Sequence, residues 1–227
     1  MKKIIIIQAR TNSKRLPGKV ILPIVGIPQI VLASKRASNT GLNVLVAISN
    51  HKFDDNLANI LKKNKIKYYR GSLNNPLKRF VEALIKYNDD TIVVRLTGDN
   101  LFPDGNLINE IITTFIQKEN KFITTNDIKS GLPKGVSVEV TKLKYLREAE
   151  KYSKNKFEKE HVTPFIIKKY GKTIFTKYHK MKSNKYVCTV DTFEDYILVS
   201  KIFELVKTPI SVSCIDLIKN LKNLYDK

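Results

Sequence analysis

Residues 3–19 read KIIIIQARTNSKRLPGK, an apolar run followed by a polar and cationic stretch. The four isoleucines are β-branched, and together they favour a buried strand over Lys3–Ile7. Gln8–Pro23 follows without a regular pattern and is expected to be a loop, and the apolar periodicity near Gln29–Arg36 predicts a helix. The chain therefore opens as strand, loop and helix.

The same alternation continues for the first 115 residues. Strands are expected at Asn43–Ile48, Lys67–Tyr69 and Thr91–Leu96. Helices are expected from Asp54 or Asp55, as cap, to about Lys63, and over Leu77–Tyr87. Such alternation predicts a mostly parallel sheet with helices on both faces, an α/β fold of the Rossmann-like kind.

The pattern changes after Phe122–Thr125. We expect one domain over residues 1–227, within which residues 130–187 form a small antiparallel α+β insertion. The expected elements are a strand at Ser137–Val140, helices at Leu143–Tyr152 and Val162–Tyr170, strands at Ile174–Lys180 and Tyr186–Val190, and helices at Phe193–Val206, capped by Asp191 or Thr192, and Ile215–Tyr225.

Composition limits the classes of protein. The formal net charge is +20, but the 41 basic residues are mostly lysines spread along the chain, so a nucleic-acid partner is not favoured. No apolar run approaches the roughly 20 residues of a membrane span, and the opening indicates a strand and not a signal peptide. Cys188 and Cys214 are isolated, which favours reduced core residues and a cytoplasmic protein.

The loop after the first strand is rich in cations. Arg10, Lys14, Arg15 and Lys19 lie within ten residues at the carboxyl end of a strand, where open α/β sheets place their ligands. Such a density suits a triphosphate. Asn12, Ser13 and Gly18 are residue types that allow backbone N–H groups to form an anion nest. The alternative is a solvated basic loop; no P-loop signature is present.

Two aspartates follow strands. Asp99 ends the run Ile92–Gly98, and Asp191 lies where the expected strand Tyr186–Val190 meets a helix. Magnesium prefers hard oxygen ligands and needs only one or two protein carboxylates beside nucleotide phosphates. From the pattern alone, Asp191 is equally suited to cap the helix.

These segments together resemble a known family. Gln8–Arg10 with Ser13–Lys19, Gly98-Asp99 and the run Val190–Asp195 are similar to the cytidylyltransferases that make CMP-Kdo and CMP-sialic acid, most strongly to the spore coat polysaccharide biosynthesis protein SpsF branch. The resemblance implies a GT-A-like fold and Mg²⁺ held by Asp99 and Asp191. It further implies a catalytic group of Lys19, Arg10 and Asp99, and a nucleotide site of Ala9, Arg10, Asn12, Ser13, Arg15, Lys19, Ser49, Arg79 and Asp99.

The likeness also implies acceptor-binding residues, which are Asn100, Glu139 and His161. Glu139 and His161, like Ser49 and Arg79, have a structural alternative: a capped turn for Ser49, a solvent-facing helix position for Arg79, a polar strand position for Glu139 and a structural histidine for His161. The chain departs from the family pattern at Asn12, where glycine is usual, and at Asn100–Pro103.

The function implied by the resemblance is transfer of CMP from CTP to an acidic sugar of the ulosonic or nonulosonic type, with release of pyrophosphate, in surface polysaccharide or glycan synthesis. The protein is expected to be a homodimer joined by the insertion. Two alternatives stay open at this point, a CTP-dependent enzyme with a phosphate or phosphonate acceptor and a non-catalytic nucleotide- or RNA-binding protein.

Overall fold

The structure is a computed structural model and describes residues 1–226. Its strands are β1 (Lys3–Gln8), β2 (Pro23–Ile24), β3 (Ile27–Pro28), β4 (Val44–Ser49), β5 (Tyr68–Gly71), β6 (Ile92–Thr97), β7 (Phe122–Thr124), β8 (Glu139–Lys142) and β9 (Thr173–Ile174). Its α-helices are α1 (Gln29–Ala37), α2 (Asp55–Lys63), α3 (Pro76–Ala83), α4 (Gly105–Gln117), α5 (Leu143–Tyr152), α6 (Lys156–His161), α7 (Pro164–Tyr170), α8 (Phe193–Glu204) and α9 (Cys214–Tyr225). Short 3₁₀ helices are η1 (Lys19–Ile21), η2 (Lys52–Asp54), η3 (Ile128–Ser130) and η4 (His179–Met181).

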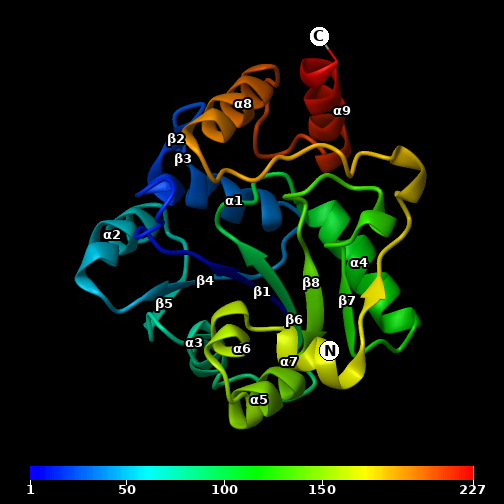
Figure 1. Ribbon diagram of the computed structural model, residues 1–227. Helices are drawn as coiled ribbons and strands as arrows, with labels where there is room; N and C mark the ends of the chain where they lie inside the picture. Colours follow the sequence, from blue (N-terminus) through cyan, green and yellow to red (C-terminus); the bar gives the residue numbers. More distant parts are fainter. Residues whose placement is uncertain (227) are drawn as a thin grey trace.

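Within residues 1–226, seven strands form one sheet in the order β5-β4-β1-β6-β8-β7-β9 (Figure 1). β1 pairs in parallel with β4 and β6, and β4 pairs in parallel with β5. β8 runs antiparallel to β6 and to β7, and β9 is again parallel to β7. A separate antiparallel pair, β2 and β3, follows the first loop. The expected α/β fold with a mostly parallel sheet is confirmed.

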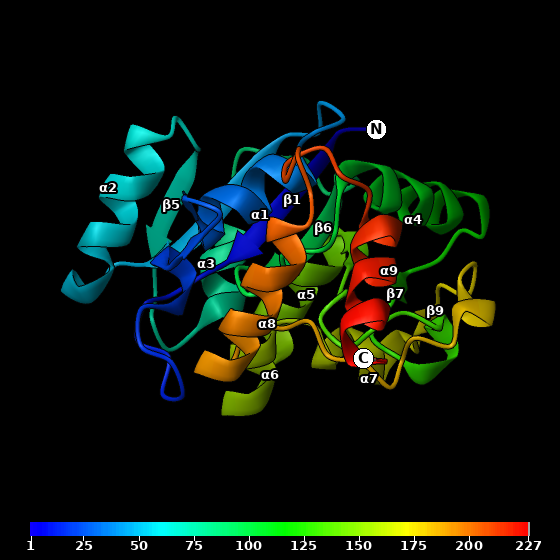
Figure 2. The ribbon, with the colours of Figure 1, turned by 90° about the horizontal axis from the view of Figure 1, so that it is seen from above.

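The isoleucines of β1 divide between two cores because side chains alternate along a strand. Ile5 and Ile7 belong to the core shared with α1, α2, α4, α8 and α9, whereas Ile4 and Ile6 face α3, α5 and α7. Figure 1 shows α8 and α9 above the sheet and α3, α5, α6 and α7 below it, and Figure 2 gives the same layers from above. Each of these isoleucines is almost fully buried, which stabilises the fold by about 1.5–3 kcal/mol per side chain.

Two of the expected strands are wrong. Ile174–Lys180 is replaced by the two-residue β9, after which the chain turns at Thr176–His179 and enters η4. Tyr186–Val190 is extended but joins the protein through isolated bridges, Asn100 with Thr189 and Lys134 with Val187. This apolar, β-branched segment crosses the ends of the central strands and does not extend their ladder. Helix α3 also ends at Ala83, four residues before the expected Tyr87.

Residues 130–187 contribute β8 and β9 to the main sheet and α5, α6 and α7 to one of its faces. The antiparallel pairing expected there lies at β8, and the bounds of the insertion stay a prediction. Cys188 and Cys214 are buried and free of disulfides in the part of the chain described, and their burial raises the pKa of both thiols. None of the helices in residues 1–226 is long and apolar enough to cross a membrane.

Candidate active site

The loop after β1 lines a cavity of about 670 Å³ at the carboxyl ends of β1 and β6. Gly18 closes this loop, because its backbone N–H donates to the carbonyl of Thr11 at 2.8 Å. The φ of Gly18 is 71°, a left-handed conformation that glycine adopts without steric cost. The cavity is lined by Gln8, Ala9, Arg10, Asn12, Ser13, Lys14, Arg15, Lys19, Val20, Leu73, Asn74, Thr97, Gly98, Asp99, Lys156, Glu160, His161 and Asp191.

Lys19 lies between the two aspartates that the sequence singles out. Its Nζ donates to Asp99 Oδ2 at 2.6 Å, to Asp191 Oδ1 at 2.8 Å and to the carbonyl of Val190 at 2.8 Å. The Lys19 side chain is only 9% exposed, so all three donor positions of its ammonium are used inside the protein. The fold therefore fixes one positive charge at the point where β1, β6 and the C-terminal part of the chain meet.

Asp191 does not cap the helix that follows it. Thr192 caps α8 in a capping box with Asp195, while Asp191 Oδ1 also accepts from Arg15 at 2.8 Å. Burial acts to raise the pKa of Asp191, but the hydrogen bond and charge of Lys19 and the charge of Arg15 outweigh it, and the pKa is lowered. Asp191 is thus held as a carboxylate facing the cavity.

Asp99 is placed by its own backbone neighbours. Thr97 Oγ1 donates to Asp99 Oδ1 at 2.6 Å, and the Val190 N–H donates to the Asp99 carbonyl at 3.2 Å. Gly98 allows the chain to pass close to β1, since a Cβ there would lie 3.2 Å from the Cβ of Ala9. The contact with Val190 brings Asp191 beside Asp99 although 92 positions separate them in the sequence.

A second cavity of about 310 Å³ shares Arg15, Thr97, Asp99 and Asp191 with the first. Two of the acceptor residues expected from the resemblance, Asn100 and Glu139, line this second cavity, whereas His161 lines the first. The remaining lining residues are Arg95, Leu96, Asn126, Lys134, Gly135, Ser137 and Thr189. The two aspartates therefore stand on the wall common to both cavities.

Glu139 is held in place within the second cavity. Arg95 Nη1 lies 2.7 Å from Glu139 Oε2, and Arg95 Nη2 donates to Gln8 Oε1 at 3.1 Å. Thr163 Oγ1 lies 3.3 Å from both carboxylate oxygens of Glu139. Lys134 also lines this cavity, and its side chain is exposed. The lining thus combines three cations, Arg15, Arg95 and Lys134, with the carboxylates of Asp99, Glu139 and Asp191. Arg15 is paired with Asp191 and Arg95 with Glu139.

The two aspartates fit a magnesium ion that is bound together with a nucleotide. Among residues 1–226 there is no group of three or more His, Cys, Asp and Glu side chains that could hold a metal. One or two carboxylates completed by phosphate oxygens and water are what Mg²⁺ commonly takes. Asp191 Oδ1 is occupied by Lys19 and Arg15, whereas Oδ2 has no hydrogen-bond partner in the described chain. The donor set is therefore suitable for an ion shared with substrate.

Helix α6 covers part of the first cavity. Arg10 Nη2 lies 3.6 Å from Glu160 Oε1, and both side chains remain substantially exposed. Lys156 lies on the same side, and the ring of His161 packs against Phe157 with centroids 4.5 Å apart. The first cavity thus has an acidic group at its edge that faces one of the loop's arginines.

Two expected nucleotide residues lie outside both cavities. Ser49 is fully buried, and its hydroxyl donates to Asp54. Arg79 is 1% exposed and donates to the Ser72 carbonyl at 3.2 Å, while its Nε and Nη2 have no partner within the described residues. Burial lowers the pKa of Arg79 to about 10, an effect that Asp54 opposes and Arg10 reinforces, so Arg79 is charged at neutral pH.

Several residues that line the two cavities carry little signal in the sequence. Arg95 and Thr97 occupy the strand before Asp99, and the charge inside the apolar run VVRLT was the available signal. Lys134 and Glu160 lie on segments whose position over the strand ends depends on tertiary contacts.

Comparisons with known proteins find similarity over nearly the whole chain. A family model described as "Cytidylyltransferase" matches residues 4–226. The chain is 27% identical to the spore coat polysaccharide biosynthesis protein SpsF of Bacillus subtilis over 97% of this chain and 94% of that protein. It superposes on a cytidylyltransferase from Leptospira borgpetersenii with a TM-score of 0.90 at 29% identity, covering 100% of this chain and 96% of the other.

A more distant structural neighbour is a CMP:2-keto-3-deoxy-manno-octonic acid synthetase in complex with CTP. The TM-score is 0.64 at 16% identity, covering 90% of this chain and 99% of the synthetase. At this identity the likeness concerns the fold alone. It extends the structural similarity to the kind of synthetase that the sequence motifs resemble.

Proposed function

Because the chain belongs to the cytidylyltransferase family, we propose that it transfers the CMP part of CTP to the hydroxyl of an acidic, sugar-like acceptor and releases pyrophosphate. The observation that carries this proposal is the cluster of Lys19, Asp99 and Asp191 on the wall shared by two cavities. A reaction that joins two substrates requires two adjoining sites with the reacting groups at their boundary.

The first cavity is the proposed nucleotide site. Arg10, Arg15 and Lys19 would bind the phosphates, and the backbone around Ala9, Asn12 and Ser13 would supply N–H donors. Arg79 is retained as a nucleotide-binding residue on the ground that two of its buried donors lack a partner in residues 1–226. Ser49 would act indirectly, through its hydrogen bond to Asp54 on the adjoining turn.

The chain's own residues would act mainly by position and charge. Lys19 offers a positive group already desolvated and oriented, which is the kind of donor that stabilises charge on a phosphoryl oxygen at little reorganisation cost. Asp99 and Asp191 would hold Mg²⁺, which would neutralise charge developing at the α-phosphate and orient the triphosphate. Arg15 belongs to the loop of residues 9–19, which we call the phosphate loop. Its ion pair with Asp191 would keep that carboxylate on the boundary between the cavities.

The second cavity is the proposed acceptor site. With Mg²⁺ offsetting the charges of Asp99 and Asp191, the cations Arg15, Arg95 and Lys134 would favour an anionic acceptor. Asn100 and Glu139 would orient its hydroxyl groups. His161, on the first cavity, would contact the acceptor only where it reaches the triphosphate. These cations would bind a phosphate or phosphonate as well as a carboxylate, which is why that alternative acceptor class is retained.

The proposal is tested by pyrophosphate release with each of CTP, UTP, ATP and GTP against acidic sugars and against phosphate- or phosphonate-bearing acceptors. We expect release with CTP and an acidic sugar, dependent on added Mg²⁺. Release only with phosphorylated acceptors would establish the alternative class. Absence of release together with absence of CTP binding would refute the proposal.

We also propose that the protein is a homodimer joined through residues 130–187. Tyr152 and Phe157 in this segment are 51% and 61% exposed, which is high for large apolar side chains. Sedimentation of the wild type and of Phe157→Ser tests this proposal. A monomeric wild type at micromolar concentration would contradict it.

A further inference from the structure

Asp54 is a fully buried carboxylate that the proposed chemistry does not use. The sequence suggests it as a cap of α2, but its side chain accepts no capping hydrogen bond from that helix. It accepts instead from the Thr11 backbone N–H at 2.8 Å and from the Ser49 backbone N–H at 3.1 Å. The hydroxyls of Thr11 and Ser49 also lie within hydrogen-bond distance of its two oxygens. Asp54 thus occupies the N-cap position of α2, as expected, but its side chain does not cap the helix.

Thr11 is the first residue of the segment that Gly18 closes. The Thr11 carbonyl accepts the Gly18 N–H, while the Thr11 N–H and hydroxyl face Asp54. The hydroxyl also lies 2.9 Å from the Phe53 carbonyl, so its single proton is shared between two acceptors on one turn. Asp54 thus holds the residue on which the closure of the phosphate loop depends.

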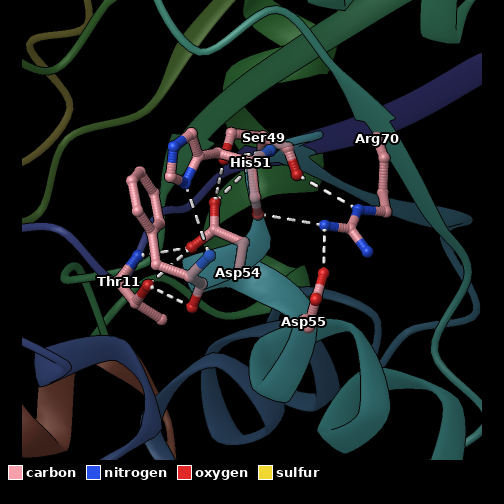
Figure 3. Close-up of polar contacts among 7 residues, drawn as sticks. Thr11, Ser49, His51, Asp54, Asp55 and Arg70 are labelled. Atoms are coloured by element: carbon pink, nitrogen blue, oxygen red, sulfur yellow. Dashed lines mark hydrogen bonds and ion pairs between the residues drawn. The ribbon is translucent and has the colours of Figure 1, made fainter.

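The turn that carries Asp54 is braced from its other side (Figure 3). Arg70 donates to the carbonyls of Ser49 and His51 at 3.2 and 3.0 Å, and its Nη2 lies 2.6 Å from Asp55 Oδ1. Figure 3 shows Thr11 and Arg70 on opposite sides of the turn, with Asp54 directed toward Thr11 and Asp55 toward Arg70. The two neighbouring aspartates therefore face different partners, and only Asp54 contacts the phosphate loop.

A buried charge is costly unless it is compensated, so this arrangement needs a reason. The Asp54 carboxylate accepts hydrogen bonds from two backbone N–H groups, those of Thr11 and Ser49. These charge-assisted bonds hold the two backbone segments more firmly than an ion pair between flexible surface side chains would. The guanidinium of Arg79 contributes an attractive charge to it from the protein interior. The compensated carboxylate joins the end of β4 to the loop after β1, a connection that sheet pairing does not provide at Thr11.

We propose that Asp54 is a positioning residue that holds the phosphate-binding loop in its ligand-ready shape through Thr11. This inference rests on the proposed function, because its expected consequence is tighter binding of CTP. A loop that is already ordered loses less conformational entropy when a triphosphate binds. Asp54 acts through Thr11 and Gly18 and does not itself line the nucleotide cavity.

The test compares Asp54→Asn, Thr11→Val and Thr11→Ser with Asp55→Asn as matched control. Asp54→Asn preserves shape but replaces a carboxylate oxygen by an NH₂ group, which cannot accept these hydrogen bonds. Thr11→Val removes the hydroxyl, whereas Thr11→Ser keeps the hydroxyl and removes only the methyl group. Asp55 is the adjacent residue, and its side chain pairs with Arg70 on the exposed side of the turn.

The first readout is amide hydrogen exchange of residues 9–19 in the protein without nucleotide. Asp54→Asn is expected to raise exchange at Thr11 and Gly18, Thr11→Val to raise it less, and Thr11→Ser and Asp55→Asn to leave it at the wild-type level. The second readout is the dissociation constant of CTP with Mg²⁺. It is expected to rise about tenfold in Asp54→Asn and to stay unchanged in Asp55→Asn.

The outcomes separate this inference from the proposed function. Faster exchange in Asp54→Asn in a protein whose wild type binds no CTP would support the positioning role and refute the proposed function. Wild-type exchange and wild-type CTP affinity in Asp54→Asn would overturn the positioning role alone. If Asp54→Asn does not fold, Thr11→Val decides, and the inference is overturned if its Gly18 exchange and CTP affinity match those of Thr11→Ser and the wild type.

Discussion

Lys19 Nζ lies 2.6 Å from Asp99 Oδ2 in an ion pair whose lysine side chain is 9% exposed. The pair joins Lys19, the first residue of η1, to Asp99, which lies two residues after the end of β6. Because Lys19 also contacts Asp191, it separates two carboxylates that would otherwise repel one another. One cation therefore serves both the fold and the proposed chemistry.

Lys19→Met should impair both catalysis and stability. The loss of a preorganised cation at a phosphoryl group is expected to lower turnover about 10²–10³-fold. Removal of one partner of a nearly buried pair leaves Asp99 and Asp191 partly uncompensated, and we expect a loss of about 1–3 kcal/mol in unfolding free energy. Pyrophosphate release, assayed well below the midpoint of thermal unfolding, distinguishes the two effects. Lys14→Met, in the same loop, is expected to alter KM for CTP only, and an unchanged turnover in Lys19→Met would remove Lys19 from the phosphate site.

Asp99→Asn and Asp191→Asn should each reduce Mg²⁺-dependent pyrophosphate release by about 100-fold or more while the protein remains folded. Both substitutions keep the side-chain shape and remove the charge that a magnesium ion requires. The measurement is a Mg²⁺ titration of the rate at saturating CTP. Glu194→Gln is the matched control, because Glu194 is an exposed carboxylate three residues beyond Asp191. Full activity in both aspartate variants would refute the proposal that Asp99 and Asp191 hold Mg²⁺.

The lowered pKa of Asp191 predicts how stability depends on pH. Lys19 and Arg15 outweigh burial and lower this pKa in the folded protein, so the stabilisation is complete above the ordinary aspartate pKa of about 3.9. It is lost as pH falls through the lowered, folded-state pKa. Urea unfolding should therefore show the wild type more stable than Asp191→Asn at about pH 6, with the difference shrinking as the solution is acidified. A difference that stays constant into the acid range would contradict the proposed ion-pair contribution.

Part of the first cavity could be predicted from sequence, because the residues that line it there follow strands closely. The residues Gln8 and Thr97 end β1 and β6, and parallel neighbours bring their carboxyl ends to one edge. Any functional residue that immediately follows such a strand is placed by the sheet itself. The structure places Asp99 and the loop from Ala9 to Lys19 at this edge, and their nucleotide-binding role stays a prediction.

Contacts between distant segments could not be predicted in the same way. Tyr186–Val190 has the apolar alternation of a strand, but its isolated bridges to Asn100 and Lys134 and the contact of Val190 with Asp99 are tertiary. Asp54 illustrates the same limit, since its position before a helix favours capping whereas Thr11, 43 residues away, determines its actual role. Local propensity cannot distinguish between these outcomes, because the competing partner lies far away in the sequence.

Glu160→Gln should improve binding of CTP at low salt. Glu160 lies 3.6 Å from Arg10 at the edge of the first cavity, where its charge opposes a triphosphate and competes for that arginine. Both groups are exposed, so the effect is modest, and we expect KM for CTP to fall about two- to fivefold. The difference should vanish at high salt because exposed charges are screened. A KM that does not change at low salt would show that Glu160 does not oppose the nucleotide.

Lys134→Gln should affect the acceptor and leave the nucleotide unaffected. Lys134 lines the second cavity but not the first, and its exposed ammonium is one of the cations available there to an acidic acceptor. Loss of this partly hydrated contact is expected to raise KM for an acidic acceptor about three- to tenfold, with KM for CTP unchanged. Lys129→Gln provides the control, since Lys129 is an exposed lysine on η3 that lines neither of these cavities. A neutral analogue of the acceptor, tested in parallel, should lose its dependence on Lys134. An equal rise in KM for CTP and for the acceptor would instead show that Lys134 acts through the electrostatic field around both cavities. That result would remove the distinction between a nucleotide cavity and an acceptor cavity.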